Sequence, residues 1–158
     1  MNLVIDPTLL DTLIAHAERD YPEECCGILV GVRRGLDRII HRAVPSNNIT
    51  EGDRRQNYQV DWEMLLRTQR QARADQMEII GFYHSHPDGS ARPSQRDLDH
   101  AWLDCSYLIL AVFVGRYVDS ASWRVDGWRR TFECEPFAVS DRAAPAYADV
   151  ADRISGRG

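Results

Sequence analysis

The sequence predicts a single α/β domain in which one mixed β-sheet is flanked by helices. Three observations lead to this prediction. The chain has 158 residues, a length that suits one domain better than two. Short apolar runs bounded by glycine alternate with segments whose apolar residues recur at helical spacing. These segments come in the order helix, hairpin, helix, strand, helix and further strands, which is typical of a sheet with flanking helices.

The composition is that of an ordinary globular domain, with 44% hydrophobic and 27% charged residues. The formal net charge of -5 argues against nucleic acid or an anionic membrane as a partner, because both require a basic face. We find no apolar run near the ~18 residues of a membrane span and no basic N-terminal leader, so we expect a cytoplasmic protein. The four cysteines include no C-x-x-C pair, so we expect buried, reduced thiols.

The first half of the chain predicts a helix, a hairpin and a long loop. Asp6 and Pro7 favour a helix start, and apolar residues continue at helical spacing to about residue 19. The apolar run 25–31 predicts a strand buried on both faces, paired with 38–44 across a glycine turn. We interpret the polar segment 45–58 as a long surface loop, a kind of segment that often carries function.

The second half predicts two more helices and several strands. In order, we expect a helix from 61, a strand at 78–84, a helix at 94–102, a strand at 107–114, and a hairpin of 120–125 and 128–134. The first of these helices is expected to bury an apolar stripe that includes Trp62 and Leu66. Asp126 and Gly127 predict a two-residue turn in the hairpin.

A cluster of polar residues follows the strand at 78–84. His84 and His86 are two residues apart at the end of that strand, so the period of two places both imidazoles on one face. Pro87 ends the strand and leaves the pair at the rim of the sheet. Asp97 lies in the first turn of the next helix and can fold back as a third ligand. Two imidazoles and one carboxylate suit zinc, and three protein ligands leave a fourth position open for water.

Each part of this cluster also has a purely structural interpretation. An isolated His-x-His is commonly a pair of partly exposed strand residues. Ser94 and Asp97 can simply begin a helix, one as its N-cap and the other favoured by the helix dipole. The convergence of four suitable side chains in one loop-and-helix segment favours a metal site, and capping is compatible with that role.

The complete pattern resembles that of the JAMM (MPN-plus, JAB-type) zinc metallopeptidases. His84-Ser85-His86, seven further residues, Ser94, two residues and Asp97 reproduce the family motif. The family also carries an upstream glutamate in the setting Glu-x-x-Gly, which Glu24-Cys25-Cys26-Gly27 matches. Glu23 is one residue too far from the glycine. The resemblance covers about residues 3–135 and is closest to small bacterial members that process sulfur-carrier proteins.

This resemblance implies a role for each motif residue. His84, His86 and Asp97 would bind one Zn²⁺ per chain. Glu24 would activate the zinc-bound water as general base and then protonate the leaving amine, while Ser94 would hydrogen-bond the developing oxyanion. Ser85, on the opposite strand face, is expected to be structural. The implied fold is a cytidine-deaminase-like single domain, with residues 1–139 as the JAMM domain and 140–158 as a polar C-terminal tail that we expect to be partly disordered.

The resemblance also implies a substrate class. Family members hydrolyse a peptide or isopeptide bond after the C-terminal glycine of a ubiquitin-like or sulfur-carrier protein. A Gly-Gly tail suits a narrow groove, because glycine lets the backbone approach closely, and such a tail can add as a strand to a sheet edge. The loop 45–58 is our candidate for holding the tail, and a plain solvated connection is an equally open interpretation. Removal of a ubiquitin-like modifier in a bacterial modification or antiviral system is the alternative role.

Other functional classes explain less of the sequence. A non-haem iron oxygenase also uses two histidines and a carboxylate, but that assignment leaves Glu24 and Ser94 without a task. A zinc nucleoside deaminase needs His-x-Glu with a later Pro-Cys-x-x-Cys, and a zincin needs His-Glu-x-x-His; the sequence has neither. A metal-free scaffold of the same fold is the non-enzyme alternative, although such relatives typically lack the ligands.

Overall fold

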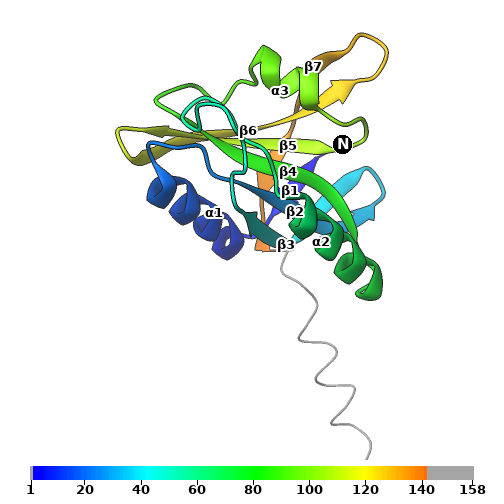
Figure 1. Cartoon of the computed structure of the whole chain (residues 1–158). Coiled ribbons are helices and arrows are strands. Elements are labelled where there is room, and N and C mark those ends of the chain that lie inside the picture. Colours follow the sequence, from blue (N-terminus) through cyan, green and yellow to red (C-terminus); the bar gives the residue numbers. More distant parts are fainter. Residues whose placement is uncertain (1, 142–158) are drawn as a thin grey trace, which may run out of the picture.

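The computed structural model describes residues 2–141 and shows one mixed eight-stranded sheet with three helices around it (Figure 1). The strands are β1 Leu3–Ile5, β2 Cys26–Arg34, β3 Asp37–Ser46, β4 Glu78–Pro87, β5 Ser106–Phe113, β6 Arg116–Asp126, β7 Thr131–Glu135 and β8 Phe137–Val139. The helices are α1 Pro7–Asp20, α2 Trp62–Ala74 and α3 Gln95–His100. The strand order is β7-β6-β5-β4-β2-β3-β1-β8, with parallel and antiparallel pairs. None of the helices in this part of the chain is long and apolar enough to cross a membrane.

Helix α1 forms where the sequence predicted it and covers one face of the sheet. Asp6 caps it by accepting a hydrogen bond from the Leu9 N–H at 2.9 Å, and Pro7 occupies the first turn. Its buried apolar residues pack into the larger core cluster with Leu3, Ile5, Cys25, Leu29, Ile40, Ile80, Tyr83, Leu108, Leu110 and Val112.

Helix α2 covers the opposite face with a narrower apolar stripe than predicted. Leu65 and Ala72 are buried against a second cluster on the sheet, formed by Ile28, Val30, Phe82 and Tyr107. Trp62 and Leu66 are 57% and 53% exposed, so the prediction that they join the core is wrong. With 3.6 residues per turn, Leu66 is rotated about 100° away from Leu65, and Trp62 begins the helix at the edge of a cleft.

Strands β2 and β4 lie side by side at the centre of the sheet. Their antiparallel register pairs Cys26 with His84, while β4 pairs in parallel with β5 on its other side. A Cβ atom at Gly81 would lie 2.0 Å from the carbonyl oxygen of Ser106, so only glycine allows β4 and β5 to approach this closely. The strand that carries both histidines is therefore an interior strand with a neighbour on each side.

Two short strands that the sequence did not reveal close the sheet. Strand β1 pairs in parallel with both β3 and β8. Strands β7 and β8 stand at opposite ends of the strand order, yet only Pro136 separates them in the chain. One residue spans at most about 3.6 Å, so the two edges of the sheet must meet there. The segment 131–139 thus pairs with β6 through its first half and with β1 through its second, and the sheet is rolled.

A buried ionic cluster lies where the rolled sheet closes. Arg38 of β3 is 2% exposed and donates from Nη1 to Ser106 Oγ at 2.9 Å and from Nη2 to Asp104 Oδ1 at 2.9 Å. Its Nη1 also lies 3.8 Å from Oε1 of the buried Glu135. Ser122 donates to Glu135 Oε2 at 2.8 Å. These contacts join β3, β5, β6 and β7.

The last hairpin differs from the predicted one. Four residues, Gly127–Arg130, separate β6 from β7, so the predicted two-residue turn is wrong. Asp126 instead begins a longer loop: its carbonyl accepts the Arg130 N–H at 2.7 Å, its side chain accepts the Trp128 N–H at 2.9 Å, and Arg130 has φ 49°. Strand β6 also begins earlier than predicted, because a tight turn at Val114 and Gly115, both with positive φ, follows β5 directly.

The cysteines are reduced but not all buried. All four cysteines are free, and Cys25 and Cys26 are buried as expected. Cys105 is half-buried and Cys134 is exposed, which corrects the expectation of four buried thiols; Cys134 lies on β7, which turns most of its side chains outward. Of the tail predicted at 140–158, all but the first two residues lie outside the described residues.

Candidate metal centre

The three predicted ligands meet at the end of β4. Nε2 of His84 and Nε2 of His86 are 3.0 Å apart. Asp97, at the start of α3, places Oδ1 3.3 Å from the His84 Nε2 and Oδ2 3.3 Å from the His86 Nε2. The three candidate ligand atoms all lie within 4.8 Å of one another. The His84 side chain is fully buried, and those of His86 and Asp97 are 13% and 8% exposed.

These spacings fit a tetrahedral cation. Ligand atoms bound 2.0–2.1 Å from zinc at tetrahedral angles lie about 3.3 Å apart. Two imidazole nitrogens 3.0 Å apart cannot present bare lone pairs to each other, so a proton or a cation must lie between them. Glu24 is a second indication of a metal site, because its Oε2 is buried and has no hydrogen-bond partner among residues 2–141. The donor set and this unpaired oxygen both suit a metal ion with its solvent.

Glu24 reaches the cluster from the segment just before β2, the strand that neighbours β4. The register that pairs Cys26 with His84 places Glu24 opposite His86 when it is continued by two residues. Residues directly opposite in an antiparallel pair have Cβ atoms about 4.5–5.5 Å apart. Burial raises the pKa of Glu24 to about 8, with His86 acting against the shift and Asp97 adding to it. The carboxyl can therefore take up and release a proton near neutral pH.

Of the other three side chains, Asp97 and His84 favour the protonation state that a metal ligand needs. Burial opposes ionisation of Asp97, but hydrogen bonds from both imidazoles outweigh it and hold its pKa far below the ordinary range. Burial lowers the pKa of His84. Burial acts in the same direction on His86, but Asp97 and the Ser90 carbonyl outweigh it and raise that pKa. At pH 7 Asp97 is ionised and His84 is neutral, as metal binding requires.

Ser94 and Asp97 begin α3 with a reciprocal cap. The Asp97 N–H donates to Ser94 Oγ at 3.1 Å, and the Ser94 N–H donates to Asp97 Oδ2 at 2.7 Å. The structural interpretation of this pair is therefore correct, and the same cap directs the carboxylate toward the histidines. The hydroxyl only accepts in the cap, so its proton remains available. Ser85 points to the other face of β4, where its Oγ accepts the Cys25 N–H at 2.8 Å.

The loop between the histidines and α3 is held from outside the motif. Trp123 of β6 donates from Nε1 to the Ala91 carbonyl at 2.8 Å. His86 Nδ1 lies 2.8 Å from the Ser90 carbonyl oxygen, and the Asp88 N–H donates to β5 at 2.7 Å. Sequence reasoning did not find Trp123, because an aromatic residue in an alternating strand gives no sign of a distant partner.

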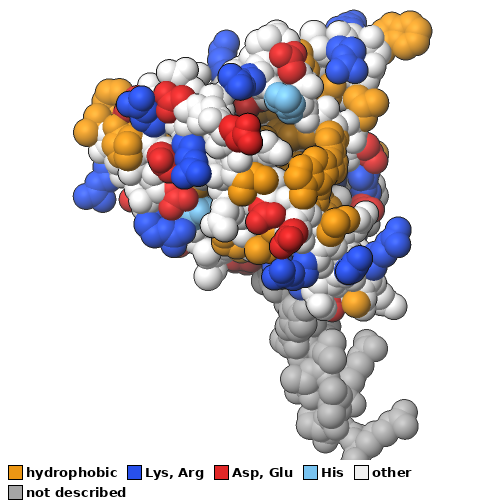
Figure 2. Space-filling model, viewed as in Figure 1, with side chains coloured by type: hydrophobic (Ala, Val, Ile, Leu, Met, Phe, Trp, Pro, Cys, Tyr) orange, Lys and Arg blue, Asp and Glu red, His pale blue; other side chains and the backbone are white. Residues whose placement is uncertain are grey.

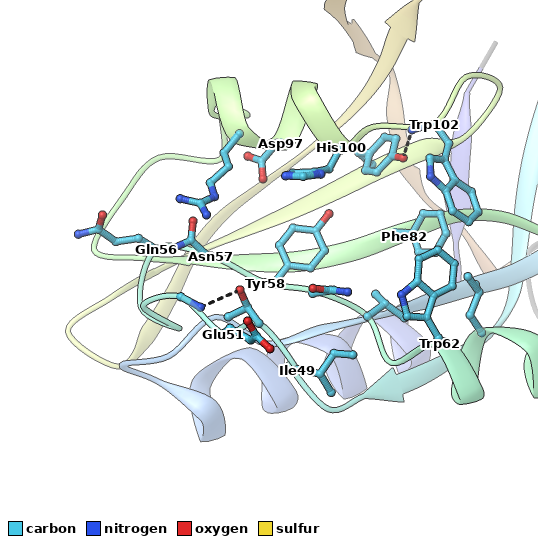
Figure 3. A pocket seen from close by; sticks show the side chains of 17 residues that line it. Ile49, Glu51, Gln56, Asn57, Tyr58, Trp62, Phe82, Asp97, His100 and Trp102 are labelled. Atoms are coloured by element: carbon cyan, nitrogen blue, oxygen red, sulfur yellow. Dashed lines mark hydrogen bonds between the residues drawn. The ribbon is translucent and has the colours of Figure 1, made fainter.

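A cleft of about 590 Å³ opens beside the candidate metal centre (Figure 2). It extends from Asp97 and Tyr58 to an aromatic end formed by Trp62, Phe82 and Trp102 (Figure 3). Phe82 lies two residues before the first histidine, on the same face of β4. The rings of the two tryptophans are 6.4 Å apart. The cleft thus offers an apolar surface that begins at the metal ligands.

The segment predicted as a long loop forms one wall of this cleft. Strand β3 extends to Ser46, so the loop is shorter than predicted at its start. Asn48 donates from Nδ2 to the carbonyls of Glu24 at 3.2 Å and of Asn57 at 2.8 Å. The Glu24 N–H in turn donates to the Arg54 carbonyl at 2.7 Å. The loop is therefore hydrogen-bonded to both the carbonyl and the N–H of Glu24.

Tyr58, at the end of this loop, is a residue of the site that the sequence did not reveal. Its ring stacks on the imidazole of His84 with a centroid distance of 4.3 Å and an interplanar angle of 21°. Burial raises the pKa of its phenol well above the ordinary value, so the side chain is neutral. No motif or periodicity in the polar loop distinguished this tyrosine.

Comparisons with known proteins identify the family. The chain is 34% identical over 128 residues to the CysO-cysteine peptidase of Mycobacterium tuberculosis, covering 79% of this chain and 84% of that protein. It is 32% identical over 107 residues to a probable TtuB-protein conjugate cleaving protease of Thermus thermophilus, covering 68% of each. A solved structure from Desulfitobacterium hafniense is similar with a TM-score of 0.76 at 27% identity, covering 87% of this chain and 92% of that one. Residues 6–126 match the family described as prokaryotic homologs of the JAB domain, so the chain belongs to the prokaryotic JAMM/MPN-plus family, with its cytidine-deaminase-like α/β fold.

Proposed function

We propose that this chain is a zinc-dependent peptidase that hydrolyses the bond after the C-terminal glycine of a ubiquitin-like or sulfur-carrier protein. The convergence of His84, His86 and Asp97 beside the buried carboxyl of Glu24 carries the proposal. The names of two relatives, a CysO-cysteine peptidase and a TtuB-protein conjugate cleaving protease, support this substrate class. We place the activity in the cytoplasm, which cell fractionation would test.

Each side chain of the site has a separate task in this mechanism. A zinc ion held by the two histidines and Asp97 would supply Lewis acidity and lower the pKa of a water molecule. Glu24 takes a proton from the water as the oxygen of the water attacks the scissile carbonyl carbon. Glu24 then gives this proton to the nitrogen of the leaving amine as the C–N bond breaks. In the metal-free chain burial raises the pKa of this carboxyl, and a bound cation would favour the ionised form that takes up the proton. Ser94 donates its hydroxyl proton to the carbonyl oxygen as charge develops, a contact worth about 2.7–4 kcal/mol in other enzymes.

The cleft suits an extended tail that ends at the metal ligands. Because β4 lies between β2 and β5, no free edge of the main sheet reaches the histidines. An added strand must therefore pair with the loop wall at 49–59 rather than with the sheet. A tail advances about 3.3 Å per residue, so a residue upstream of the two glycines would be the one to reach the aromatic end. We expect an apolar side chain at that position to lie between Trp62 and Trp102.

Substitution of Glu24 by glutamine tests the proposed base. The amide keeps the shape of the side chain but cannot take up the proton, so turnover of a Gly-Gly-tailed carrier should fall by about 10²–10⁴-fold. Zinc should remain at one ion per chain. Product masses and metal analysis measure the two quantities. The matched control is Glu23→Gln, one residue away, which should retain full activity. Normal turnover by Glu24→Gln would refute the assignment of the base.

The relative that cleaves TtuB conjugates favours a second role, removal of a ubiquitin-like modifier from lysine side chains. In both roles the same tail binds in the cleft, and only the leaving amine differs. The two roles are separated by offering one carrier as a peptide extended by a single residue and as a lysine isopeptide. The ratio of the two kcat/KM values then identifies the preferred bond. Cleavage of neither substrate by zinc-loaded protein would argue for a binding module.

A further inference from the structure

The two histidines of the metal centre are oriented in different ways. The second ring nitrogen of a metal-binding histidine usually donates to an acceptor that fixes the ring. His86 follows this rule, since its Nδ1 lies 2.8 Å from the Ser90 carbonyl oxygen. His84 does not, because its Nδ1 is buried and has no hydrogen-bond partner anywhere in residues 2–141. The contact that His84 has instead is the stacked ring of Tyr58, at 4.3 Å and 21°.

We propose that Tyr58 is a positioning residue for His84, and that its flat ring, in place of a hydrogen bond, sets the angle of the imidazole. Histidine χ2 is a broad torsion with weak intrinsic preferences, so the plane of a buried imidazole must be fixed by its surroundings. Rotation about χ2 would swing the Nε2 of His84 away from the Asp97 carboxylate, which is 3.3 Å distant. A nearly parallel ring against one face of the imidazole prevents that rotation.

The loop carrying Tyr58 is thereby part of the metal centre. The same loop is hydrogen-bonded to the backbone of Glu24 through Asn48 and Arg54, so it supports the base as well as one ligand. Figure 3 shows Tyr58 projecting into the cleft, with its hydroxyl end toward Asp97 and His100. A tail lying in the cleft would contact the very residue that orients His84. This inference rests on the proposed function only through the ligand role of His84 and not through any substrate.

Zinc affinity of four single variants tests the inference. Tyr58→Phe keeps the ring, whereas Tyr58→Met and Tyr58→Leu fill the space without a flat face. Competition with a chelating dye should give Tyr58→Phe a Kd within about twofold of the natural chain and weaken both non-aromatic variants about 10-fold or more. The cobalt-loaded non-aromatic variants should also show an altered visible absorption spectrum. Gln59→Ala, the adjacent loop residue, should bind zinc like the natural chain.

Two results would overturn the inference: zinc binding by a folded Tyr58→Met variant as tight as by the natural chain, or a loss in Tyr58→Phe as large as in Tyr58→Met. If neither non-aromatic variant folds, proton NMR of the natural zinc-loaded chain decides. The His84 ring protons must then show an upfield ring-current shift and cross-relaxation with Tyr58, and unshifted protons refute the stacking. Zinc affinity needs no substrate, so a chain that passes these tests but cleaves no carrier fails the proposed function alone.

Discussion

Glu24 illustrates how burial changes the chemistry of one carboxyl. Its pKa rises from an ordinary 4.5 to about 8, chiefly through loss of solvent. Between these two values the folded metal-free chain holds a proton that the unfolded chain has released. Stability therefore decreases as the pH rises through this window, because the unfolded state binds fewer protons. A cation bound beside the carboxyl would favour its ionised form and remove this dependence.

This linkage predicts the behaviour of the metal-free protein. Chelator-treated natural chain should lose stability between pH 5 and pH 8, by an amount of order a few kcal/mol since each pKa unit is worth about 1.4 kcal/mol. Metal-free Glu24→Gln carries no titrating group at this position and should not show that loss. Thermal unfolding of both proteins at several pH values makes the comparison. Superimposable pH profiles would mean that the Glu24 carboxyl is not shifted.

At the level of residues, the sequence predicted which side chains come together where these are close in the chain. His84, His86 and Asp97 lie within one strand, loop and helix start, so their spacing alone was enough to bring them together. The sequence did not predict Tyr58 and Trp123, because their roles depend on contacts that only the tertiary fold creates.

Among the elements, the loop from Pro87 to Ser94 is held by a residue distant in the sequence. Its ends are a strand and a helix cap, but its middle is held by the indole of Trp123 through a hydrogen bond to Ala91. Ala91 is itself buried against Ile109 and Ala111 of β5. The position of Ser94 relative to the histidines therefore depends on β6.

Trp123→Phe should separate this support from the motif itself. The substitution keeps an aromatic ring but removes the indole Nε1–H donor, and loss of this hydrogen bond to Ala91 should cost about 0.5–1.5 kcal/mol of unfolding free energy. Because Ser94 and Asp97 follow the loop, kcat should fall more than KM rises. Steady-state kinetics and urea unfolding measure these effects. Trp128→Phe provides the control, since Trp128 is 95% exposed and makes no side-chain hydrogen bond to another described residue. Equal kcat and KM values for Trp123→Phe and Trp128→Phe would show that Trp123 does not position the loop.

The three helices could be predicted from the sequence because each carries its own start signal, an Asp or Ser cap followed by a helical pattern. Strands β1 and β8 could not, because three residues have too little pattern and depend on pairing with partners far along the chain. The turn after Asp126 was predicted from a favoured dipeptide, and the loop that forms instead is set by hydrogen bonds to Asp126.

For the molecule as a whole, the buried side chains of Arg38 and Glu135 lie where the sheet closes, with Arg38 Nη1 3.8 Å from Glu135 Oε1. Both side chains are almost wholly removed from solvent, and they come from strands widely separated in the strand order. Breaking a buried ion pair leaves one charge uncompensated, whereas removal of both charges together is far less harmful.

Arg38→Met should therefore lower the free energy of unfolding by at most about 3–5 kcal/mol, because the buried Glu135 would lose one of its two cationic neighbours and keep Arg124, whose Nε lies 3.4 Å from Glu135 Oε1. The double variant Arg38→Met, Glu135→Met should recover most of that loss. Urea titration with comparable m-values for all three proteins makes the measurement. A double variant as unstable as the single one would show that Arg38 acts through Ser106 and Asp104 instead.

The pairing of β1 with β8 has a consequence for how the protein is made. Among the strands of residues 2–141, Leu3–Ile5 is synthesised before the others, while its outer partner Phe137–Val139 is synthesised after them. Until β8 has been synthesised, one side of β1 must stay without its neighbour. A strand of three residues offers little backbone for another chain to pair with, so its brevity would protect the nascent polypeptide until the fold can close.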